Sequence, residues 1–578
     1  MMILMNISSC GTCIRRIADE YVPLLCLDKA IAMQFLASCN IVVVYLILLL
    51  VISGIFSTNG LSAPIIKTTS GSLSGVVETA NKVQVETFKG IPYAAPPVGA
   101  LRWRAPAPPT SWSGTRVADT FGAACPQGAN AMTKFYKVDI SEDCLFLNIY
   151  RPLNTSVGDN MPVMIFFHGG SYVVGAASFF VYEAAERIAQ SQNIIIVTAN
   201  YRLQALGFLG GNLLRDPADG STGNWGLKDQ RFAMKWVKEN AKKFGGDQNL
   251  VTIFGESAGS GSVGNHMVMP KSWPYFHRAI MESGPIAASW ISMPMNASEY
   301  NLKEVLVRLK CPPATNATAA MSCLRSKNIS EIYRASDSTK PHDDPGGVNL
   351  IDWSPVVDGV ELTDVPLNLL RQGKVNQVPV LLGTNHDEGT EFVKPKESKM
   401  TLQLYKEFLN KTFGPNLAPE VFSEYPLSKY KSPWRAAVDA LGDEAMSCPA
   451  RETARYLSDA NLPVFLYFFV HELNWLKIDS KAGKGLGVFH GSELIFVFEK
   501  SVAFLGKGES ALGRSFGEWW ISFATNGAPV SKTSGATWSA YTRSSDSHME
   551  IDVGKSMMKS GLKKSVCDFW AAKAPIES

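Results

Sequence analysis

Ser257 stands where an apolar run gives way to small residues, in the pattern Gly255-Glu-Ser-Ala-Gly259. The preceding residues 250–254 are rich in β-branched side chains and predict a buried strand. A strand followed at once by a sharp turn and a helix is the context in which G-x-S-x-G presents a nucleophilic hydroxyl. Glycines at 255 and 259 remove β-carbons that would clash in such a turn. We therefore expect Ser257 Oγ to lie exposed at a helix N-terminus, which favours developing negative charge.

A second copy of the same pattern, Gly513-Arg-Ser-Phe-Gly517, serves as an internal control. No strand-like run precedes it, and it lies within a segment of helical spacing. We interpret Ser515 as a structural residue.

The segment Phe166-Phe-His-Gly-Gly-Ser-Tyr172 follows another strand-like run. A serine nucleophile needs backbone N–H groups aimed at the tetrahedral oxyanion, on a loop that can approach the substrate closely. Paired glycines allow that approach, although a glycine turn is also common in ordinary βα loops. Because the segment precedes the serine by at least one βα unit, its position favours an oxyanion loop.

A serine nucleophile also needs an acid and a histidine. In a fold of this kind the chain order is serine, then acid, then histidine. Residues 379–388 predict a strand that runs into a loop and offers Asp387 and Glu388. His471, His490 and His548 lie beyond these acids. His471 continues a strong strand and is interpreted as structural, whereas His490 lies in a glycine-flanked loop and is favoured. Spacing does not separate Glu388 from Asp387.

The composition is that of an ordinary globular protein, since 46% of the 578 residues are hydrophobic and 19% are charged. The net charge of +3 is small, and no run of lysine or arginine indicates a nucleic-acid partner. Strand-like runs alternate with helical segments such as 225–243, which predicts an α/β fold with a mainly parallel sheet. Segments 71–78 and 83–91 predict antiparallel edge strands. We expect residues 64–578 to form a single catalytic domain.

The N-terminal region predicts targeting rather than fold. Residues 41–56 are apolar and uncharged but shorter than the about 20 residues of a membrane span. They resemble the apolar core of a signal peptide with a cleavage site near Ala63. We expect residues 1–32 to be an upstream extension and 33–63 a signal peptide starting at Met33. The alternative is an uncleaved signal anchor, which would make the chain a type II membrane protein with a lumenal catalytic domain.

The cysteines and sequons support secretion. Six cysteines remain after residue 63, and an even number in a secreted chain indicates three disulfides with 15 possible pairings. These are Cys125, Cys144, Cys311, Cys323, Cys448 and Cys567. Glycosylation sequons begin at Asn154, Asn296, Asn316, Asn328 and Asn410.

Seven stretches together resemble the type-B carboxylesterase family, which includes carboxylesterases, cholinesterases and related lipases. The resemblance covers about residues 64–575, and the stretches are 88–103, 141–152, 168–171, 223–230, 244–259, 383–389 and 488–494. It implies an α/β-hydrolase fold with a large central, mostly parallel (mixed) sheet flanked by helices. It also implies ester hydrolysis that needs no cofactor or metal.

The resemblance assigns residues to roles. It implies a triad of Ser257, Glu388 and His490, with oxyanion donors at the backbone N–H groups of Gly170, Ser171 and Ala258. It implies the disulfides Cys125–Cys144, Cys311–Cys323 and Cys448–Cys567. It places Glu256, Ser283 and Glu493 as supports behind the triad.

Three departures bear on the substrate. The oxyanion loop has Ser171 where many members have a third glycine, and its β-carbon restricts the backbone. The Cys125–Cys144 loop contains no tryptophan to hold a quaternary ammonium, and Phe135 and Tyr136 are its only aromatic residues. Glu256 stands where juvenile hormone esterases typically have glutamine. Cholinesterase and juvenile hormone esterase specialisations are therefore disfavoured.

The expected function is a secreted serine carboxylic-ester hydrolase acting on broad, apolar, small-molecule esters. One alternative is a lipase acting on acylglycerols, with the Cys125–Cys144 loop as a lid. Another is a non-catalytic adhesion or binding protein on the same fold, since fold does not fix function. A membrane partner is expected only if the N-terminal segment is uncleaved, and the sequence leaves the oligomeric state open.

Overall fold

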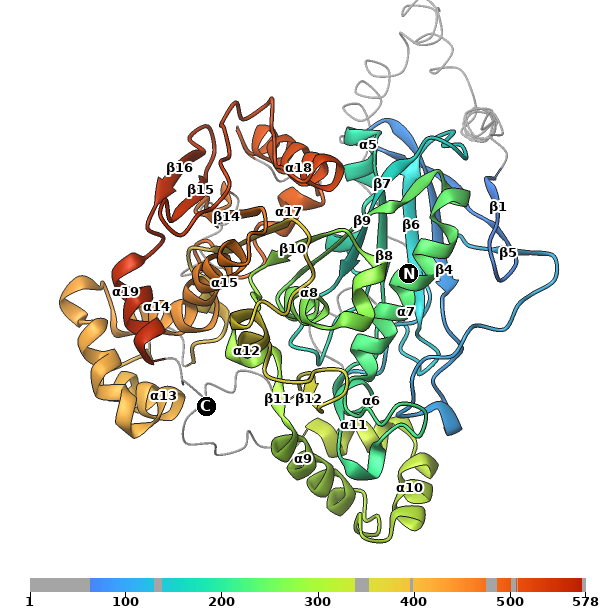
Figure 1. Cartoon of the computed structure of the whole chain (residues 1–578), viewed down its shortest axis with the longest axis horizontal. Helices are drawn as coiled ribbons and strands as arrows, with labels where there is room; N and C mark the ends of the chain where they lie inside the picture. The colour runs from blue at the N-terminus through green and yellow to red at the C-terminus, as the bar shows by residue number, and fades with distance from the viewer. Residues whose placement is uncertain are drawn as a thin grey trace, which may run out of the picture. The chain divides into compact units, whose positions relative to one another are not determined.

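A mixed sheet of eleven strands organises the part of the chain that the computed structural model describes (Figure 1). The described residues are 63–128, 138–337, 353–394, 399–474, 486–500, 506 and 508–573, and all belong to the compact unit Ala63–Ser578. The predicted upstream extension and signal peptide lie outside them, as do Phe135 and Tyr136.

The strand order of the sheet is β16-β15-β14-β13-β10-β9-β7-β8-β6-β4-β3. The strands are β3 (Val76–Ala80), β4 (Val83–Pro92), β6 (Phe146–Pro152), β7 (Met161–Phe167), β8 (Ile195–Ala199), β9 (Gly246–Glu256), β10 (Arg278–Glu282), β13 (Val380–Asn385), β14 (Val464–Phe469), β15 (Ser547–Ile551) and β16 (Met557–Ser560). Neighbours from β8 through β15 pair in parallel, and the strands beyond them pair antiparallel. The predicted α/β fold with antiparallel edge strands is confirmed.

Smaller strands and the helices complete the unit. One smaller sheet has three strands, β1 (Ile65–Lys67), β2 (Ser72–Ser74) and β5 (Thr115–Val117). Another pairs β11 (Met293–Pro294) with β12 (Val356–Val357). The helices are α5 (Ala185–Ser191), α6 (Gln204–Phe208), α7 (Trp225–Asn240), α8 (Ala258–Val268), α9 (Met295–Arg308), α10 (Ala317–Ser326), α11 (Ile329–Asp337), α12 (Pro366–Arg371), α13 (Leu402–Glu424), α14 (Pro433–Gly442), α15 (Cys448–Asp459), α17 (Leu494–Val497), α18 (Glu509–Asn526) and α19 (Lys564–Lys573).

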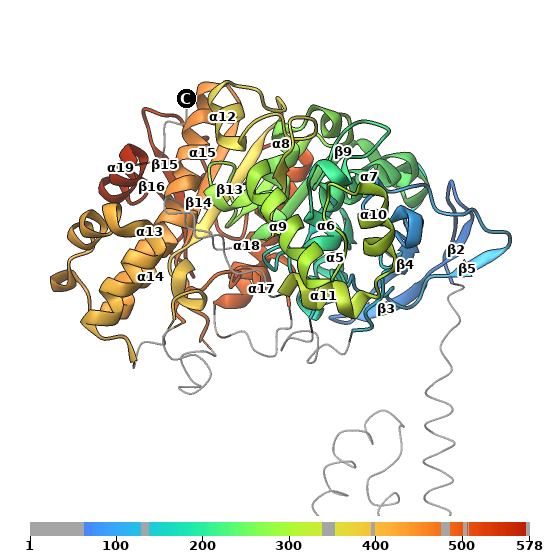
Figure 2. The same cartoon turned by 90° about the horizontal axis from the view of Figure 1, so that it is seen from below.

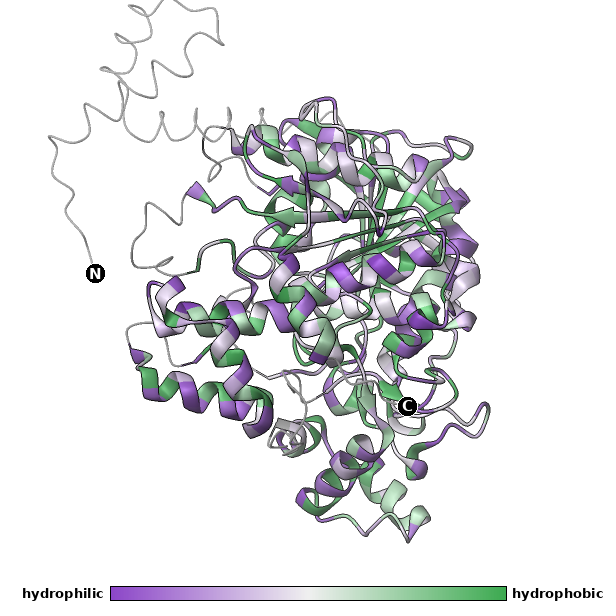
Figure 3. Ribbon diagram, turned by 60° about the vertical axis from the view of Figure 1, so that its left-hand side comes forward, coloured by the Kyte–Doolittle hydropathy of each residue, from purple (hydrophilic) through white to green (hydrophobic). Residues whose placement is uncertain are grey.

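The two faces of the sheet are covered by different helices. Along β7, Ile165 and Phe167 join a core that includes α7, α8 and α15, while Phe166 joins a core that includes α5, α17 and α18. This follows from the two-residue period of a strand, which sends successive side chains to opposite faces. Figure 2 places α8 and α15 on one side and α17 and α18 on the other. Strands β7, β8 and β14 are runs of mostly hydrophobic, buried residues, as a parallel sheet covered on both faces requires (Figure 3).

A third hydrophobic cluster lies among α13, α14 and α19, and includes Tyr405, Trp434 and Trp570. Its cysteines Cys448 and Cys567 form a disulfide. The other two disulfides are Cys125–Cys144 and Cys311–Cys323, so all three pairs that the resemblance implied are present in the structure.

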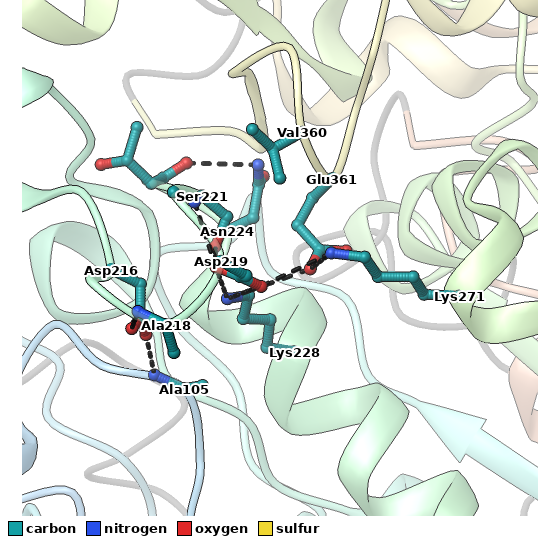
Figure 4. A network of polar contacts seen from close by, with 12 residues as sticks. Ala105, Asp216, Ala218, Asp219, Ser221, Asn224, Lys228, Lys271, Val360 and Glu361 are labelled. Atoms are coloured by element: carbon teal, nitrogen blue, oxygen red, sulfur yellow. Dashed lines mark hydrogen bonds and ion pairs between the residues drawn. The ribbon is translucent and has the colours of Figure 1, made fainter.

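A polar network fixes the N-terminal end of α7 (Figure 4). The Asp219 carboxylate accepts hydrogen bonds from Ser221 and from the buried Lys228. Lys271 lies between Asp219 and Glu361, at 3.5 and 3.2 Å from their carboxylate oxygens. Glu361 is also paired with Arg231 at 2.6 Å. Because these charges alternate in sign, the network ties the loop before α7 to the segment after β12.

No helix within the described ranges is both long and apolar enough to cross a membrane. The predicted signal or anchor segment, residues 41–56, lies outside the described residues.

Candidate active site

Ser257 lies at the junction of β9 and α8, as the strand–turn–helix pattern predicts. Its φ of 57° and ψ of −126° are strained for a residue with a β-carbon. A β-carbon on Gly259 would lie 1.9 Å from the carbonyl oxygen of Phe167, and one on Gly255 would lie 2.5 Å from the carbonyl carbon of Gly259. The two glycines are therefore required by close backbone approach.

Most of the Ser257 residue is covered, since only 8% of it is exposed. The loop after β7 covers it: a β-carbon on Gly169 would lie 2.9 Å from the Ser257 β-carbon. Gly170 has a φ of 106° and Ser171 a φ of 55°. The predicted oxyanion loop thus lies beside the nucleophile, with Ser171 in the left-handed region where a glycine would be unstrained.

His168 holds the start of this loop through its contacts with Tyr201. Its ring stacks on Tyr201 at 4.5 Å, and the Tyr201 hydroxyl donates to the His168 carbonyl at 2.7 Å. Burial lowers the pKa of His168 to about 4, so the ring is neutral at physiological pH. The ring's Nδ1 lies 2.8 Å from the Gly169 carbonyl and is assigned as the protonated nitrogen because it faces an acceptor.

Glu388 and His490 are brought together. The His490 Nδ1 atom is 2.6 Å from Glu388 Oε2. The other carboxylate oxygen accepts hydrogen bonds from the Ser283 hydroxyl at 2.5 Å and from the Asn385 backbone N–H at 2.7 Å. Glu388 is 1% exposed, so these three bonds fix the orientation of its carboxylate. Phe392 packs edge-on against the His490 ring, with centroids 5.2 Å apart.

The other ring nitrogen of His490 faces Glu256 instead of the serine. Nε2 lies 3.1 Å from Glu256 Oε1, but neither atom has a hydrogen-bond partner within the described residues. Burial alone would lower the pKa of His490, but the charges of Glu256 and Glu388 raise it above its usual value. Burial raises the pKa of Glu256, although the charge of His490 opposes this. The two groups therefore titrate as a pair.

Glu282 is a buried acid of this site that the sequence argument did not identify. It pairs in register with Glu256 across β9 and β10, so both side chains point to the same face of the sheet. One Glu282 oxygen accepts a hydrogen bond from Trp520 Nε1 at 2.8 Å. Burial, together with the nearby charges of Glu493 and Glu256, raises the pKa of Glu282 well above its usual value. Burial beside these two acids thus disfavours the ionised form of Glu282.

The same row of side chains continues across the sheet. Gly383 pairs with Glu282 on one side and with Tyr467 on the other, and the Tyr467 ring occupies the space over this glycine. Glu493 is fully buried and accepts a hydrogen bond from the Asn385 side chain at 2.5 Å. Burial is the main cause that raises the pKa of Glu493 to about 8. The predicted supports Glu256, Ser283 and Glu493 thus lie around the Glu388–His490 pair.

The remaining candidates lie elsewhere. Asp387 is paired with Arg435 at 2.9 Å, and not with His490, within the described residues. Ser515 lies inside α18, where its hydroxyl donates to the Ala511 carbonyl. His471 bridges Glu509 and Asp552, which agrees with its interpretation as structural. His548 lies in β15, two strands from β13.

No group of metal-ligating side chains occurs in the described ranges. All five sequon asparagines are exposed.

Comparison with known proteins agrees with the fold. The model of the carboxylesterase family matches residues 62–570. The cholinesterase of Mus musculus is 33% identical over 537 residues, covering 88% of this chain and 86% of that protein. Carboxylesterase 5A of Felis catus is 33% identical over 550 residues, covering 90% and 96%. The acetylcholinesterase of Leptinotarsa decemlineata is 30% identical over 549 residues, covering 88% and 85%.

The predicted resemblance is confirmed over the whole unit that carries Ser257, Glu388 and His490. Both the extent of the family match and the nearly full-length alignment to these relatives lead to one conclusion. The chain belongs to the carboxylesterase family and is a serine ester hydrolase.

Proposed function

We propose that this enzyme hydrolyses small, apolar carboxylic esters through an acyl-enzyme formed on Ser257, with His490 as the general base and Glu388 as the acid that orients it. The observation that carries the proposal is the 2.6 Å contact between His490 Nδ1 and Glu388 Oε2, next to a serine held in a strained strand–helix turn. Nothing in this arrangement calls on a cofactor or metal.

The chemistry follows from the positions of these groups. His490 takes the proton of the Ser257 hydroxyl as Oγ attacks the ester carbonyl, which places negative charge on the carbonyl oxygen. The backbone N–H groups of Gly170, Ser171 and Ala258 would donate to that oxyanion, supported by the position of Ala258 at the first turn of α8. The alcohol leaves with the proton from His490. In the second half of the reaction His490 takes a proton from water as the water attacks the acyl-enzyme. Ser257 Oγ is now the leaving group and receives that proton from His490.

His490 Nε2 has no hydrogen-bond partner within the described residues, so its bond to the Ser257 hydroxyl would form in the complex with substrate. Catalytic hydrogen bonds are often loose in the unliganded state and shorten only in the reacting complex. The contact between Nε2 and Glu256 is poorly aligned, so little is lost when that bond forms.

We also propose that the enzyme is secreted. Three disulfides lie within the described residues, and disulfides persist in oxidising compartments. The exposed positions of the sequon asparagines suit glycosylation. Peptide sequencing of secreted protein should find an N-terminus close to Pro64. An intact N-terminus on membrane-bound material would favour the signal-anchor alternative.

Turnover of nitrophenyl esters of graded chain length tests the catalytic proposal. Ser257→Ala and His490→Ala should each lower kcat by several orders of magnitude, and the double variant should lose little more, because the residues act as a unit. Ser515→Ala is the matched control and should keep wild-type activity. Near-normal turnover by Ser257→Ala would overturn the assignment. Strong activation at an oil–water interface would favour the lipase alternative.

The acid is tested by a second pair of variants. Glu388→Gln should lower kcat much more than Asp387→Asn, because Glu388 is the one of these two acids that bonds His490 Nδ1. The opposite ranking would identify Asp387 as the catalytic acid.

A further inference from the structure

Asp387 joins the loop that carries Glu388 to the loop that carries His490. Its backbone N–H donates to the Val488 carbonyl at 2.9 Å, and its carboxylate accepts from the Val488 backbone N–H at 2.7 Å. Val488 precedes His490 by two residues. One residue thus holds both polar groups of the Val488 backbone, which we call the Asp387–Val488 clasp.

The residues on either side extend this connection. The Asn385 side chain donates to the Phe489 carbonyl at 2.9 Å. Three consecutive residues, 488–490, are therefore held by Asp387, Asn385 and Glu388 respectively. The end of β13 and the turn that follows it therefore hold the backbone and the imidazole of these three residues.

The clasp requires a glycine at its side. Gly487 has a φ of +60°, and a β-carbon there would lie 2.1 Å from the Asp387 carboxylate. Only a residue without a side chain lets the two loops approach this closely. The glycine before Val488 is thus explained by the carboxylate that it faces.

Opposite charges compensate the Asp387 carboxylate. The oxygen that does not face Val488 accepts from Arg435 at 2.9 Å and lies 3.0 Å from His386 Nδ1. Burial would raise the pKa of Asp387, but His386, the Val488 N–H and Arg435 together lower it. Asp439 and Lys563 are the other charged groups that act on it electrostatically. An ionised carboxylate is the stronger acceptor for the Val488 N–H.

Helix α14 supports the same place from behind. Arg435 belongs to α14, and a β-carbon on Gly389 would lie 2.2 Å from the Val438 carbonyl oxygen. Gly442, at the end of α14, faces the Glu388 β-carbon in the same way, at 3.2 Å. The turn that carries both acids therefore packs directly against this helix.

We propose that Asp387 is a positioning residue for the reaction, which clasps the His490 loop to the Glu388 loop and links both to α14 through Arg435. The inference rests on the proposed function, because it assigns to Asp387 the task of holding the general base. It also explains why two adjacent acids follow β13: one orients the imidazole ring, and the other orients the backbone that carries the ring.

The variant Asp387→Ala removes the acceptor for the Val488 N–H and the partner of Arg435. A displacement of His490 by about 1 Å should lower kcat about 100-fold. KM should change by less than about threefold, because Asp387 is not expected to contact substrate and uniform binding is retained. Asp387→Asn keeps an oxygen that can accept from Val488, so it should recover most of this loss.

The pH profile separates positioning from a general loss of structure. The charge of Glu388 raises the pKa of His490, so loosening their contact should lower that pKa. The acid limb of kcat/KM should therefore move to lower pH in Asp387→Ala and return toward wild type in Asp387→Asn. Asp459→Asn is the control, since Asp459 forms an exposed pair with Arg543 on the surface. It should leave both kcat and the acid limb unchanged.

Gly487→Ala gives a second test in case Asp387→Ala does not fold. Its β-carbon must push against the Asp387 carboxylate while Asp387 itself remains. It should show the same signature, a loss of kcat with a shifted acid limb and little change in KM. Rates are to be divided by the fraction of sites that a fluorophosphonate labels at completion, so that unfolded protein does not count.

The outcomes distinguish this inference from the proposed function. An inactive wild type, or an active Ser257→Ala variant, would refute the proposed function. If Ser257→Ala is inactive while Asp387→Ala and Gly487→Ala keep wild-type kcat and acid limb per labelled site, then the function stands and the positioning role is refuted.

Discussion

Replacing Glu256 with glutamine tests the electrostatics of the site most directly. Glu256 Oε1 lies 3.1 Å from His490 Nε2, and both residues are buried. An ionised carboxylate at this distance stabilises the imidazolium form, which cannot accept the proton of Ser257. Glutamine keeps the shape of the side chain and removes the charge. We therefore expect the pKa of His490 to fall in Glu256→Gln.

The magnitude can be bounded from the distance. At 3.1 Å and an effective dielectric constant of about 20, two unit charges interact by about 5 kcal/mol, or about 4 pH units. Because burial raises the pKa of Glu256, this residue is not fully ionised over the acid range. The two groups share protons, so the observed shift should lie between about 1 and about 4 pH units.

The sign follows from the direction of each change. A carboxylate raises the pKa of a neighbouring histidine, so its removal lets the imidazole lose its proton at lower pH. The acid limb of kcat/KM for a neutral nitrophenyl ester should move to lower pH, because this limb reports the base of the free enzyme. The measurement is a pH–rate profile, with the rate of fluorophosphonate labelling as a second readout of the same base.

Glu391→Gln provides the graded control. Glu391 is also a carboxyl group that raises the pKa of His490, but it is the weakest of the causes and its side chain is exposed. Its removal should shift the acid limb less than the removal of Glu256. An unchanged or upward-shifted limb in Glu256→Gln, or a larger shift in Glu391→Gln, would refute the reasoning.

Three further predictions concern stability, packing and substrate. Burial opposes ionisation of Glu361, but hydrogen bonds from Arg231 lower its pKa. Glu361→Gln should therefore destabilise the protein by about 3 kcal/mol near neutral pH, measured by urea denaturation. The loss should become smaller as the pH falls through the pKa of Glu361 in the folded protein. Gly259→Ala should abolish activity and lower the melting temperature, whereas Gly264→Ala in the same helix, whose β-carbon would meet only Ile286 at 3.2 Å, should be nearly neutral in activity assays and calorimetry. With matched acyl groups, kcat/KM for a neutral short-chain ester should equal or exceed that for the choline ester, since one cation–π contact is worth only about 0.5–2 kcal/mol. A 100-fold preference for the choline ester, on the order of 3 kcal/mol, would contradict this prediction.

The fold class and the strand–turn–helix setting of Ser257 could be predicted because they depend on local sequence patterns. The strand before Ser257 and the glycines beside it are requirements of backbone geometry, and the structure meets each of them at the predicted position. Ser515 shows the limit of the bare pattern, because the same three residues at the same spacing lie inside α18 and produce no turn. The context of the motif, and not its letters, carried the prediction.

The electrostatic surroundings of His490 could not be predicted, because they depend on strand register. β9 and β10 both end in a glutamate that a serine follows, and parallel pairing places Glu282 beside Glu256. That repetition was visible in the sequence, but the adjacency of the two strands was not. Asp387 and Glu388 likewise could not be separated by spacing. Their roles depend on which carboxylate meets the Val488 backbone and which meets the His490 side chain.

Three serines around the reacting groups have a strained backbone. Ser171, Ser257 and Ser283 all have positive φ angles, between 55° and 57°. Glycine would adopt these conformations more easily, but Ser257 and Ser283 need a hydroxyl, one to attack and one to hold Glu388. The surrounding sheet offsets the strain: the Ser257 N–H donates to the Glu282 carbonyl, and the Ser283 N–H donates to the Gly383 carbonyl, each at 2.9 Å. Both strained serines thus extend the hydrogen bonding of β9, β10 and β13 beyond the ends of the strands. The rigidity of the parallel sheet is therefore what keeps the nucleophile and the support of its acid in conformations that neither would adopt alone.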